Sequence, residues 1–237
     1  MLLQWRQPKP LIRTDGLCFT YQPPEGIFPI LSEKIQGHFE QYQEGNTDKG
    51  NHPLFLVLSG AGTGKSRFLD EFQSLCVKAL EETSPKLSEK IKNSYVFKVN
   101  FENGVSVDAF SDGSHSIGSR MLFQLSDEHW DTFRQKGAAM ISPFAVLSKL
   151  AEIEKKQLSD LTVLLLVDGM QEIYRESKEK FRVALKVVSD LVNGSSNSAG
   201  CPFLIACCSA TFHNPVSSVL SESNQFRHEI QLNPLDG

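Results

Sequence analysis

The sequence Leu54-Phe-Leu-Val-Leu-Ser-Gly-Ala-Gly-Thr-Gly-Lys-Ser66 joins a short apolar run to a glycine-rich turn that ends in Gly-Lys-Ser. This pattern is typical of a buried strand that delivers a phosphate-binding loop to the start of a helix. Backbone N–H groups of such a loop surround phosphate oxygens, Lys65 reaches the β- and γ-phosphates, and the Ser66 hydroxyl binds Mg²⁺. The helix that follows directs its positive N-terminal end at the same anion.

The loop departs at one position from the pattern Gly-x-x-x-x-Gly-Lys-[Ser/Thr], because Ser59 stands where the first glycine is usual. Three glycines still give the loop positions that tolerate a positive φ. Apolar residues then repeat at helical spacing from Phe68 to Leu75, so the motif has both a strand before it and a helix after it. That context favours a phosphate site over a turn that binds nothing. The residues predicted to bind nucleotide are Gly60, Ala61, Gly62, Thr63, Gly64, Lys65, Ser66 and Arg67.

A second apolar run, Leu161 to Val167, ends at Asp168. A parallel strand that ends in a carboxylate matches the Walker B arrangement, in which the acid helps to hold Mg²⁺ near the phosphate loop. Taken alone the signal is weak, because strands often end in an Asp that caps a turn. Together with the phosphate loop, it predicts a Mg²⁺ site made by Ser66 and Asp168.

The residues after Asp168 read Gly-Met-Gln-Glu, so no carboxylate is adjacent to it that would activate water. Three explanations remain open. Gln171 positions the water by hydrogen bonding, as a Gln does in some GTPases. Glu102, at the end of the second predicted strand, reaches the γ-phosphate from a neighbouring strand; or the chain binds nucleotide with little hydrolysis. The candidate catalytic residues are therefore Lys65, Gln171 and Glu102, although a solvated turn carboxylate is the plainer interpretation of Glu102.

Other polar residues follow predicted strands or lie on predicted helices. Ser209 and Thr211, after the fourth strand, either contact the γ-phosphate or cap a turn. Arg120 lies in an otherwise apolar helix and is a candidate arginine finger, with a solvated face as the alternative. The other arginines considered for that role are Arg134, Arg175 and Arg227.

The composition fits one large domain of 237 residues with 40% hydrophobic residues. The net charge of −4 and a pI of about 5.9 do not indicate a dedicated nucleic-acid binder. The five cysteines are odd in number and lack zinc spacing, which favours reduced thiols in an intracellular chain. No secretory signal or membrane-spanning run is visible, so we expect an intracellular location, cytoplasmic or nuclear, and no membrane partner.

Residues 1–27 are rich in proline without periodicity and predict an extended arm, and the core is expected to occupy residues 28–237. Apolar strands alternate with helices, which predicts a three-layer α/β sandwich with a mainly parallel central sheet and a ligand at the carboxyl ends of the strands. Strands are expected at 54–58, 95–101, 161–167, 203–208 and 227–232, helices at 29–44, 65–82, 117–125, 143–157 and around 181–191, and loops at 43–50, 105–117 and 193–200.

Three segments together resemble the NTPase domain of Crinkler-type proteins, namely Leu58–Arg67, Val99–Gly104 and Leu166–Gln171. The resemblance covers roughly residues 50–235, and the Phe-Glu-Asn-Gly and Val-Asp-Gly-Met-Gln sequences are its most particular parts. It implies a P-loop NTPase of the ASCE type, related to the AAA+/STAND group, that uses ATP and Mg²⁺. Such domains typically precede an effector domain. This chain has no N-terminal secretion header and ends where a helical lid would begin, so we expect the lid and effector domain to be absent.

The sequence therefore predicts Mg²⁺-dependent ATP binding with slow hydrolysis. One alternative is a non-hydrolysing switch or interaction module, which the missing acid beside Asp168 favours. The other is a small-molecule kinase, for which we see no basic lid cluster. ATP is preferred over GTP because of the resemblance and because no Asn-Lys-x-Asp guanine motif occurs. For protein partners, we consider a second copy of the chain or a separate effector domain.

Overall fold

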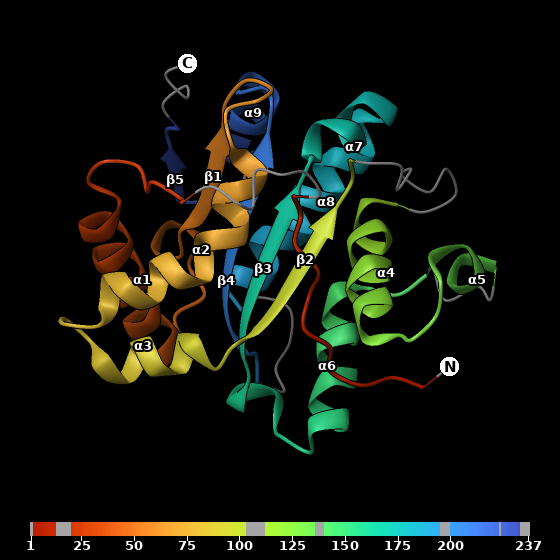
Figure 1. The fold of residues 1–237 in the computed structure, drawn as a ribbon, viewed down its shortest axis with the longest axis horizontal. Helices are drawn as coiled ribbons and strands as arrows, with labels where there is room; N and C mark the ends of the chain where they lie inside the picture. Colours follow the sequence, from red (N-terminus) through yellow and green to blue (C-terminus); the bar gives the residue numbers. More distant parts are fainter. Residues whose placement is uncertain are drawn as a thin grey trace.

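The computed structural model describes residues 2–12, 20–102, 112–135, 140–194, 200–222 and 224–232. Its centre is a five-stranded parallel sheet with the strand order β2-β3-β4-β1-β5 (Figure 1). β3 is buried along its whole length, as expected for an apolar strand covered on both faces. The strands are β1 (Leu54–Leu58), β2 (Tyr95–Asn100), β3 (Thr162–Asp168), β4 (Phe203–Ala210) and β5 (Arg227–Ile230).

The strand register brings the carboxyl ends of the central strands to one edge of the sheet. Leu58 pairs with Ala210, and Asn100 pairs with Asp168. The predicted parallel sheet is therefore confirmed, and the segments that follow β1, β2 and β3 start from the same edge.

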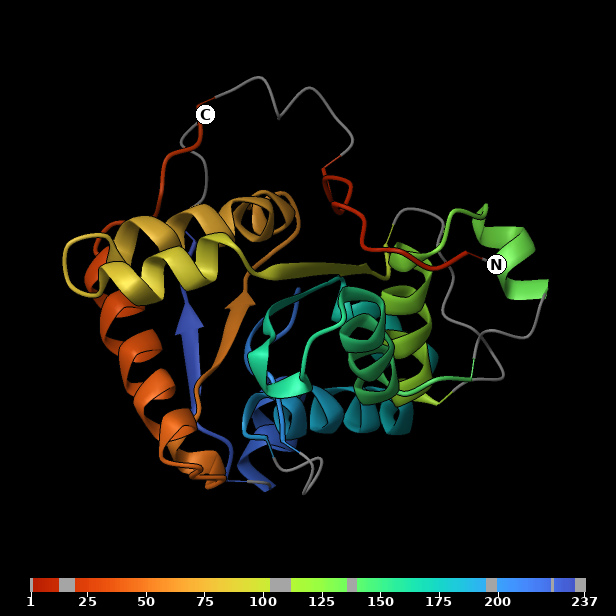
Figure 2. The same ribbon diagram turned by 90° about the horizontal axis from the view of Figure 1, so that it is seen from below.

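Two layers of helices cover the sheet, and consecutive side chains in the strands alternate between them. Figure 2 shows α2 and α3 on one side of the sheet and α8 on the other. Phe55 and Val57 of β1 pack toward the first layer, whereas Leu54 and Leu56 pack toward the second. The predicted three-layer α/β architecture is confirmed. The first layer contains α1 (Ile27–Gln43), α2 (Lys65–Leu80) and α3 (Pro85–Lys92), and the second contains α4 (Gly113–Leu125), α6 (Pro143–Glu154), α7 (Met170–Glu176), α8 (Lys178–Val192) and α9 (Asn214–Glu222).

Several local predictions were wrong. The predicted helix 65–82 ends before Pro85, as α2 does, but α3 was not predicted; Pro85 occupies its first turn, where the missing N–H costs nothing. The predicted loop 105–117 overlaps α4, whose N-cap Asp112 accepts from the His115 amide at 2.8 Å; residues 105–111 of that loop lie outside the described part. The short helices α5 (Trp130–Gln135), α7 and α9 were not predicted, because each is too short to show a clear period.

The first described part of the N-terminal arm, residues 2–12, runs along the edge of the sheet beside β2 and α4 (Figure 1). The Trp5 ring meets the Tyr95 ring edge-on at a centroid distance of 4.9 Å. Further along, the amides of Leu11 and Ile12 donate to the Asp70 carboxylate at 3.0 to 3.1 Å. Across the described ranges, no helix combines the length and the apolar character needed to cross a bilayer.

A buried histidine pair joins α1 to the segment before β1. His38 lies 1% exposed, with its Nε2 2.8 Å from the Leu204 carbonyl and its Nδ1 2.8 Å from Nδ1 of His52. Burial lowers the pKa of His38 to about 4 and also lowers the pKa of His52. Between that value and the ordinary histidine pKa near 6.5, the unfolded chain binds protons that the folded chain does not.

We therefore expect the free energy of unfolding to fall as the pH is lowered from 7.5 to 4.5. The folded pKa of His38 lies below its unfolded value, so its contribution is complete above about pH 6.5 and is lost toward pH 4. The expected loss from this residue is about 2.5 kcal/mol. Urea denaturation at both pH values measures it, and His38→Gln, which keeps a donor for Leu204, is expected to reduce the pH dependence by about that amount. An unchanged pH dependence in this variant would contradict the assignment.

Candidate functional site

The glycine-rich loop turns sharply between β1 and α2. Gly62 and Gly64 have φ values of 79° and 86°, which L side chains rarely adopt, and Gly64 is the N-cap residue of α2. Ser59, the residue that departs from the usual pattern, shares a hydrogen bond of 2.6 Å with the Thr63 hydroxyl. Thr63 Oγ1 also lies 2.9 Å from the Gly60 carbonyl. Ser59 is thus compatible with the loop because its side chain helps to close it.

Lys65 is the first residue of α2 and is only 8% exposed. Its Nζ donates to the Gly60 carbonyl at 2.6 Å, so the ammonium group lies over the loop. Burial lowers the pKa of Lys65, while the carboxylates of Glu102 and Asp168 act in the opposite direction. A cation over a glycine-rich loop and next to a helix N-terminus is an arrangement that suits an anion.

The hydroxyl of Ser66 and the carboxylate of Asp168 meet across the gap between β1 and β3. Ser66 Oγ donates to Asp168 Oδ2 at 2.7 Å, although the residues are 102 positions apart. Ser209, which is fully buried near the end of β4, donates to the other carboxylate oxygen and accepts from the Gly169 amide at 3.2 Å. Ser209 therefore holds Asp168 in place, a role that differs from both sequence-based options for this residue.

Glu102 and Gln171, the two alternative candidates for activating water, lie in direct contact. Gln171 Nε2 donates to Glu102 Oε1, and Gln171 is 2% exposed. Gly169 makes this approach possible, because a Cβ at that position would lie 2.6 Å from Glu102 Cγ. Gln171 Oε1 is buried and has no hydrogen-bond partner among the described residues. The pair thus presents a buried acceptor atom that requires a donor.

The end of β2 is fixed by further contacts that the sequence did not indicate. The Glu102 amide donates to Asn100 Oδ1 at 2.6 Å, and the Phe101 amide donates to the Asp168 carbonyl at 3.0 Å. Arg120 of α4 donates through Nε to the Asn100 carbonyl at 3.0 Å. The sequence singled out Arg120 from its apolar helix but not its contact with β2, and no local pattern identifies Asn100, because these contacts join distant parts of the chain.

The remaining candidate arginines have partners outside the loop. Arg67 forms an ion pair of 2.7 Å with Glu71 one helical turn away. Arg175 pairs with Glu172, and Arg227 donates to the Ser217 carbonyl at 3.2 Å. The side chain of Arg134 lies outside the described part of the structure.

The residues present fit a magnesium ion and a nucleoside triphosphate. A serine hydroxyl and a carboxylate are hard oxygen donors of the kind that Mg²⁺ prefers, and Mg²⁺ typically takes few protein ligands in addition to phosphate oxygens. In the ranges that the structure describes, no cluster of three or more His, Cys, Asp or Glu side chains offers a dedicated protein-only metal site. The site therefore suits a metal that arrives with its phosphate ligand.

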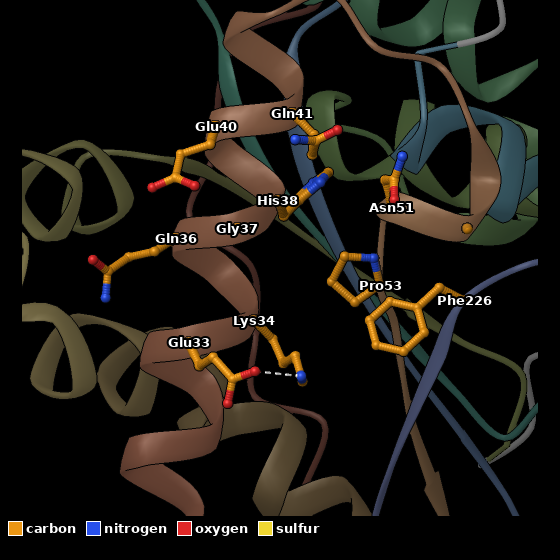
Figure 3. A pocket seen from close by; sticks show the side chains of 11 residues that line it. Glu33, Lys34, Gln36, Gly37, His38, Glu40, Gln41, Asn51, Pro53 and Phe226 are labelled. Carbon is orange, nitrogen blue, oxygen red and sulfur yellow. Dashed lines mark hydrogen bonds and ion pairs between the residues drawn. The ribbon is translucent and has the colours of Figure 1, made fainter.

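A separate hollow of about 560 Å³ lies at the opposite end of β1, between α1 and the residues just before β1 and β5 (Figure 3). Pro53 and Phe226 form its apolar side, and Glu33 and Lys34 face each other across 2.6 Å. None of the residues predicted from the motifs lines it. The hollow is separate from the glycine-rich loop, because that loop lies at the carboxyl ends of the strands.

Comparison with known proteins supports the similarity to Crinkler-type proteins. No family model matches the chain. The chain is 34% identical to Crinkler effector protein 108 from Phytophthora sojae over an alignment of 252 positions. The alignment covers 99% of this chain but only 30% of the relative, so the chain spans less than a third of that protein's length. Almost the whole chain is therefore similar to one segment of a Crinkler effector protein.

Proposed function

We propose that the chain is the NTPase module of a Crinkler-type protein, that it binds Mg²⁺·ATP, and that it hydrolyses ATP slowly. The observation that carries the proposal is the contact of 2.7 Å between Ser66 and Asp168. Two motifs that were identified independently in the sequence supply the two oxygen ligands expected of one Mg²⁺ site, and the fold brings these oxygens into contact.

The strand order supports assignment to the ASCE class of P-loop NTPases, to which the AAA+ and STAND proteins belong. In that class one additional strand separates the phosphate-loop strand from the Walker B strand. Here β4 lies between β1 and β3. β4 also contributes Ser209, whose hydroxyl binds the Asp168 carboxylate.

In the proposed reaction, Lys65 and the loop amides bind the phosphates, and Ser66 and Asp168 bind Mg²⁺. The metal supplies charge neutralisation at the phosphate oxygens. Glu102 accepts a proton from the attacking water, and Gln171 Oε1 accepts a second hydrogen bond from it. Gln171 Oε1 has no partner among the described residues, and the Glu102 carboxylate is also an acceptor, so the pair suits a water molecule that donates to both.

The relative suggests the wider setting. It is named as an effector protein, and most of its length has no counterpart in this chain. We propose that a separate effector domain or a second copy of the module is the partner through which the nucleotide state acts. Preference for ATP rests on the family resemblance.

Lys65→Ala is expected to abolish ATP binding, because it removes the only cation placed over the loop by the described contacts. Isothermal titration calorimetry with Mg²⁺·ATP measures the affinity. Lys78→Ala serves as the matched control, since Lys78 is an exposed lysine near the other end of α2. Unchanged affinity in Lys65→Ala would refute the proposed nucleotide site.

Asp168→Asn is expected to weaken binding only when Mg²⁺ is present, because the variant removes a charged metal ligand and leaves the loop intact. Titrations of ATP with Mg²⁺ and with EDTA separate the two contributions. We expect the variant and the wild type to bind alike in EDTA and to differ by about tenfold or more with Mg²⁺, on the scale of a lost charge-assisted contact. Equal affinities under both conditions would remove Asp168 from the metal site.

Glu102→Gln and Gln171→Ala are expected to leave ATP affinity near that of the wild type and to lower the single-turnover rate. Loss of a general base typically costs about 10² to 10⁴ in rate, so Glu102→Gln is expected to have the larger effect. Rapid-quench measurements with ATP and with GTP give both rates. If the wild type binds ATP but shows no turnover, the chain is a nucleotide-dependent switch and the hydrolytic part of the proposal fails.

A further inference from the structure

Resting on the proposed function, we propose that Arg120 is a positioning residue for the Glu102–Gln171 pair, acting through Asn100. Arg120 lies on α4 and is 6% exposed, so it is a buried cation and not a finger directed at a neighbouring molecule. A buried arginine is costly to desolvate unless its donors and its planar faces are occupied. Two of its nitrogen atoms donate to main-chain carbonyls, and two aromatic rings lie against the guanidinium group.

The guanidinium group of Arg120 is fixed by aromatic rings and by two main-chain acceptors. It lies 4.2 Å from the centroid of the Phe101 ring and 5.3 Å from that of Trp130. Nε donates to the Asn100 carbonyl at 3.0 Å, and Nη1 donates to the Ser116 carbonyl at 2.9 Å in the preceding turn of α4. These contacts tie the last residue of β2 to the middle of α4.

Asn100 passes this constraint to Glu102. The Asn100 side chain accepts from the Glu102 amide at 2.6 Å, and Asn100 pairs with Asp168 in the sheet. The backbone from Asn100 to Glu102 is thus held on one side by Arg120 and on the other by β3. Glu102 then fits against Gly169 and accepts from Gln171. Loss of Arg120 releases the strand end from α4, so the carboxylate moves relative to Gln171.

The first experiment measures the NMR signal of the Gln171 side-chain amide, which reports on the surroundings of this residue and does not depend on activity. In a ¹⁵N–¹H spectrum of the full chain, the side-chain amide of Gln171 is assigned as the signal that Gln171→Ala removes. Arg120→Met is expected to shift this signal toward that of a free glutamine amide. The matched control is Arg227→Met, because Arg227 also donates to a main-chain carbonyl but lies on β5. A Gln171 signal that stays in place in Arg120→Met overturns the proposal.

A second variant keeps the test decisive if Arg120→Met fails to fold. Arg120→Lys retains the positive charge and the aliphatic stem, but one ammonium group replaces the planar donors of Nε and Nη1. We expect a smaller shift of the Gln171 signal in the same direction. If this signal coincides with that of the wild type, the planar contacts of Arg120 do not set the position of the pair.

The second experiment tests whether the effect acts through Glu102. Arg120→Met is expected to keep ATP affinity within about twofold and to lower the single-turnover rate by about tenfold or more, as for a catalytic group displaced by about 1 Å. Added to Glu102→Gln, it is expected to cause no further loss, because the two residues act as a unit. A loss that multiplies with that of Glu102→Gln contradicts the positioning role.

The two proposals fail in different ways. If the wild type binds ATP without turnover, the hydrolytic function is refuted, whereas the Gln171 signal still decides whether Arg120 positions the pair. If turnover is normal in Arg120→Met and the Gln171 signal is unchanged, the role of Arg120 is refuted while the proposed ATPase function stands.

Discussion

The hydrogen bond between Ser66 and Asp168 is the contact on which the site depends. It joins the first turn of α2 to the end of β3, and no local sequence constraint brings these residues together. The parallel register of β1, β4 and β3 places both at one sheet edge, and Ser209 of β4 holds the second carboxylate oxygen. A buried carboxylate needs such partners, because leaving one unpaired in the interior is costly. The sheet thus fixes the glycine-rich loop and Asp168 relative to each other.

A second constraint is the crowding where β2 and β3 end. Gly169 adopts a positive φ of 78° and leaves the space that Glu102 occupies. Any side chain at this position would meet Glu102 and separate it from Gln171. The absence of a carboxylate directly after Asp168 is therefore compatible with an acid at the site, because the neighbouring strand supplies one. Asn100 and Arg120 fix that strand end from the other side.

Patterns within short segments of the sequence were enough to predict most of the secondary structure. The apolar runs identified all five strands, because a buried strand needs consecutive apolar residues. The Gly-Lys-Ser sequence located the start of α2, because the glycine before the helix adopts a positive φ that few other residues accept. α3 was missed because Pro85 was interpreted as the end of a helix, although proline is also favoured in the first turn of one. α5, α7 and α9 are too short for periodicity to identify them.

By itself, the sequence determined the residues of the candidate site, since the Gly-Lys-Ser loop and the strand that ends in Asp168 are each contiguous in the chain. It left Glu102 and Gln171 as alternatives, and only the tertiary structure decided that they form a contacting pair. It also suggested other roles for Ser209 and Arg120. In the fold, Ser209 donates to the Asp168 carboxylate and Arg120 donates to the Asn100 carbonyl. The physical reason is the same in each case, because strand order and register bring together residues whose separation along the chain carries no information about their distance in space.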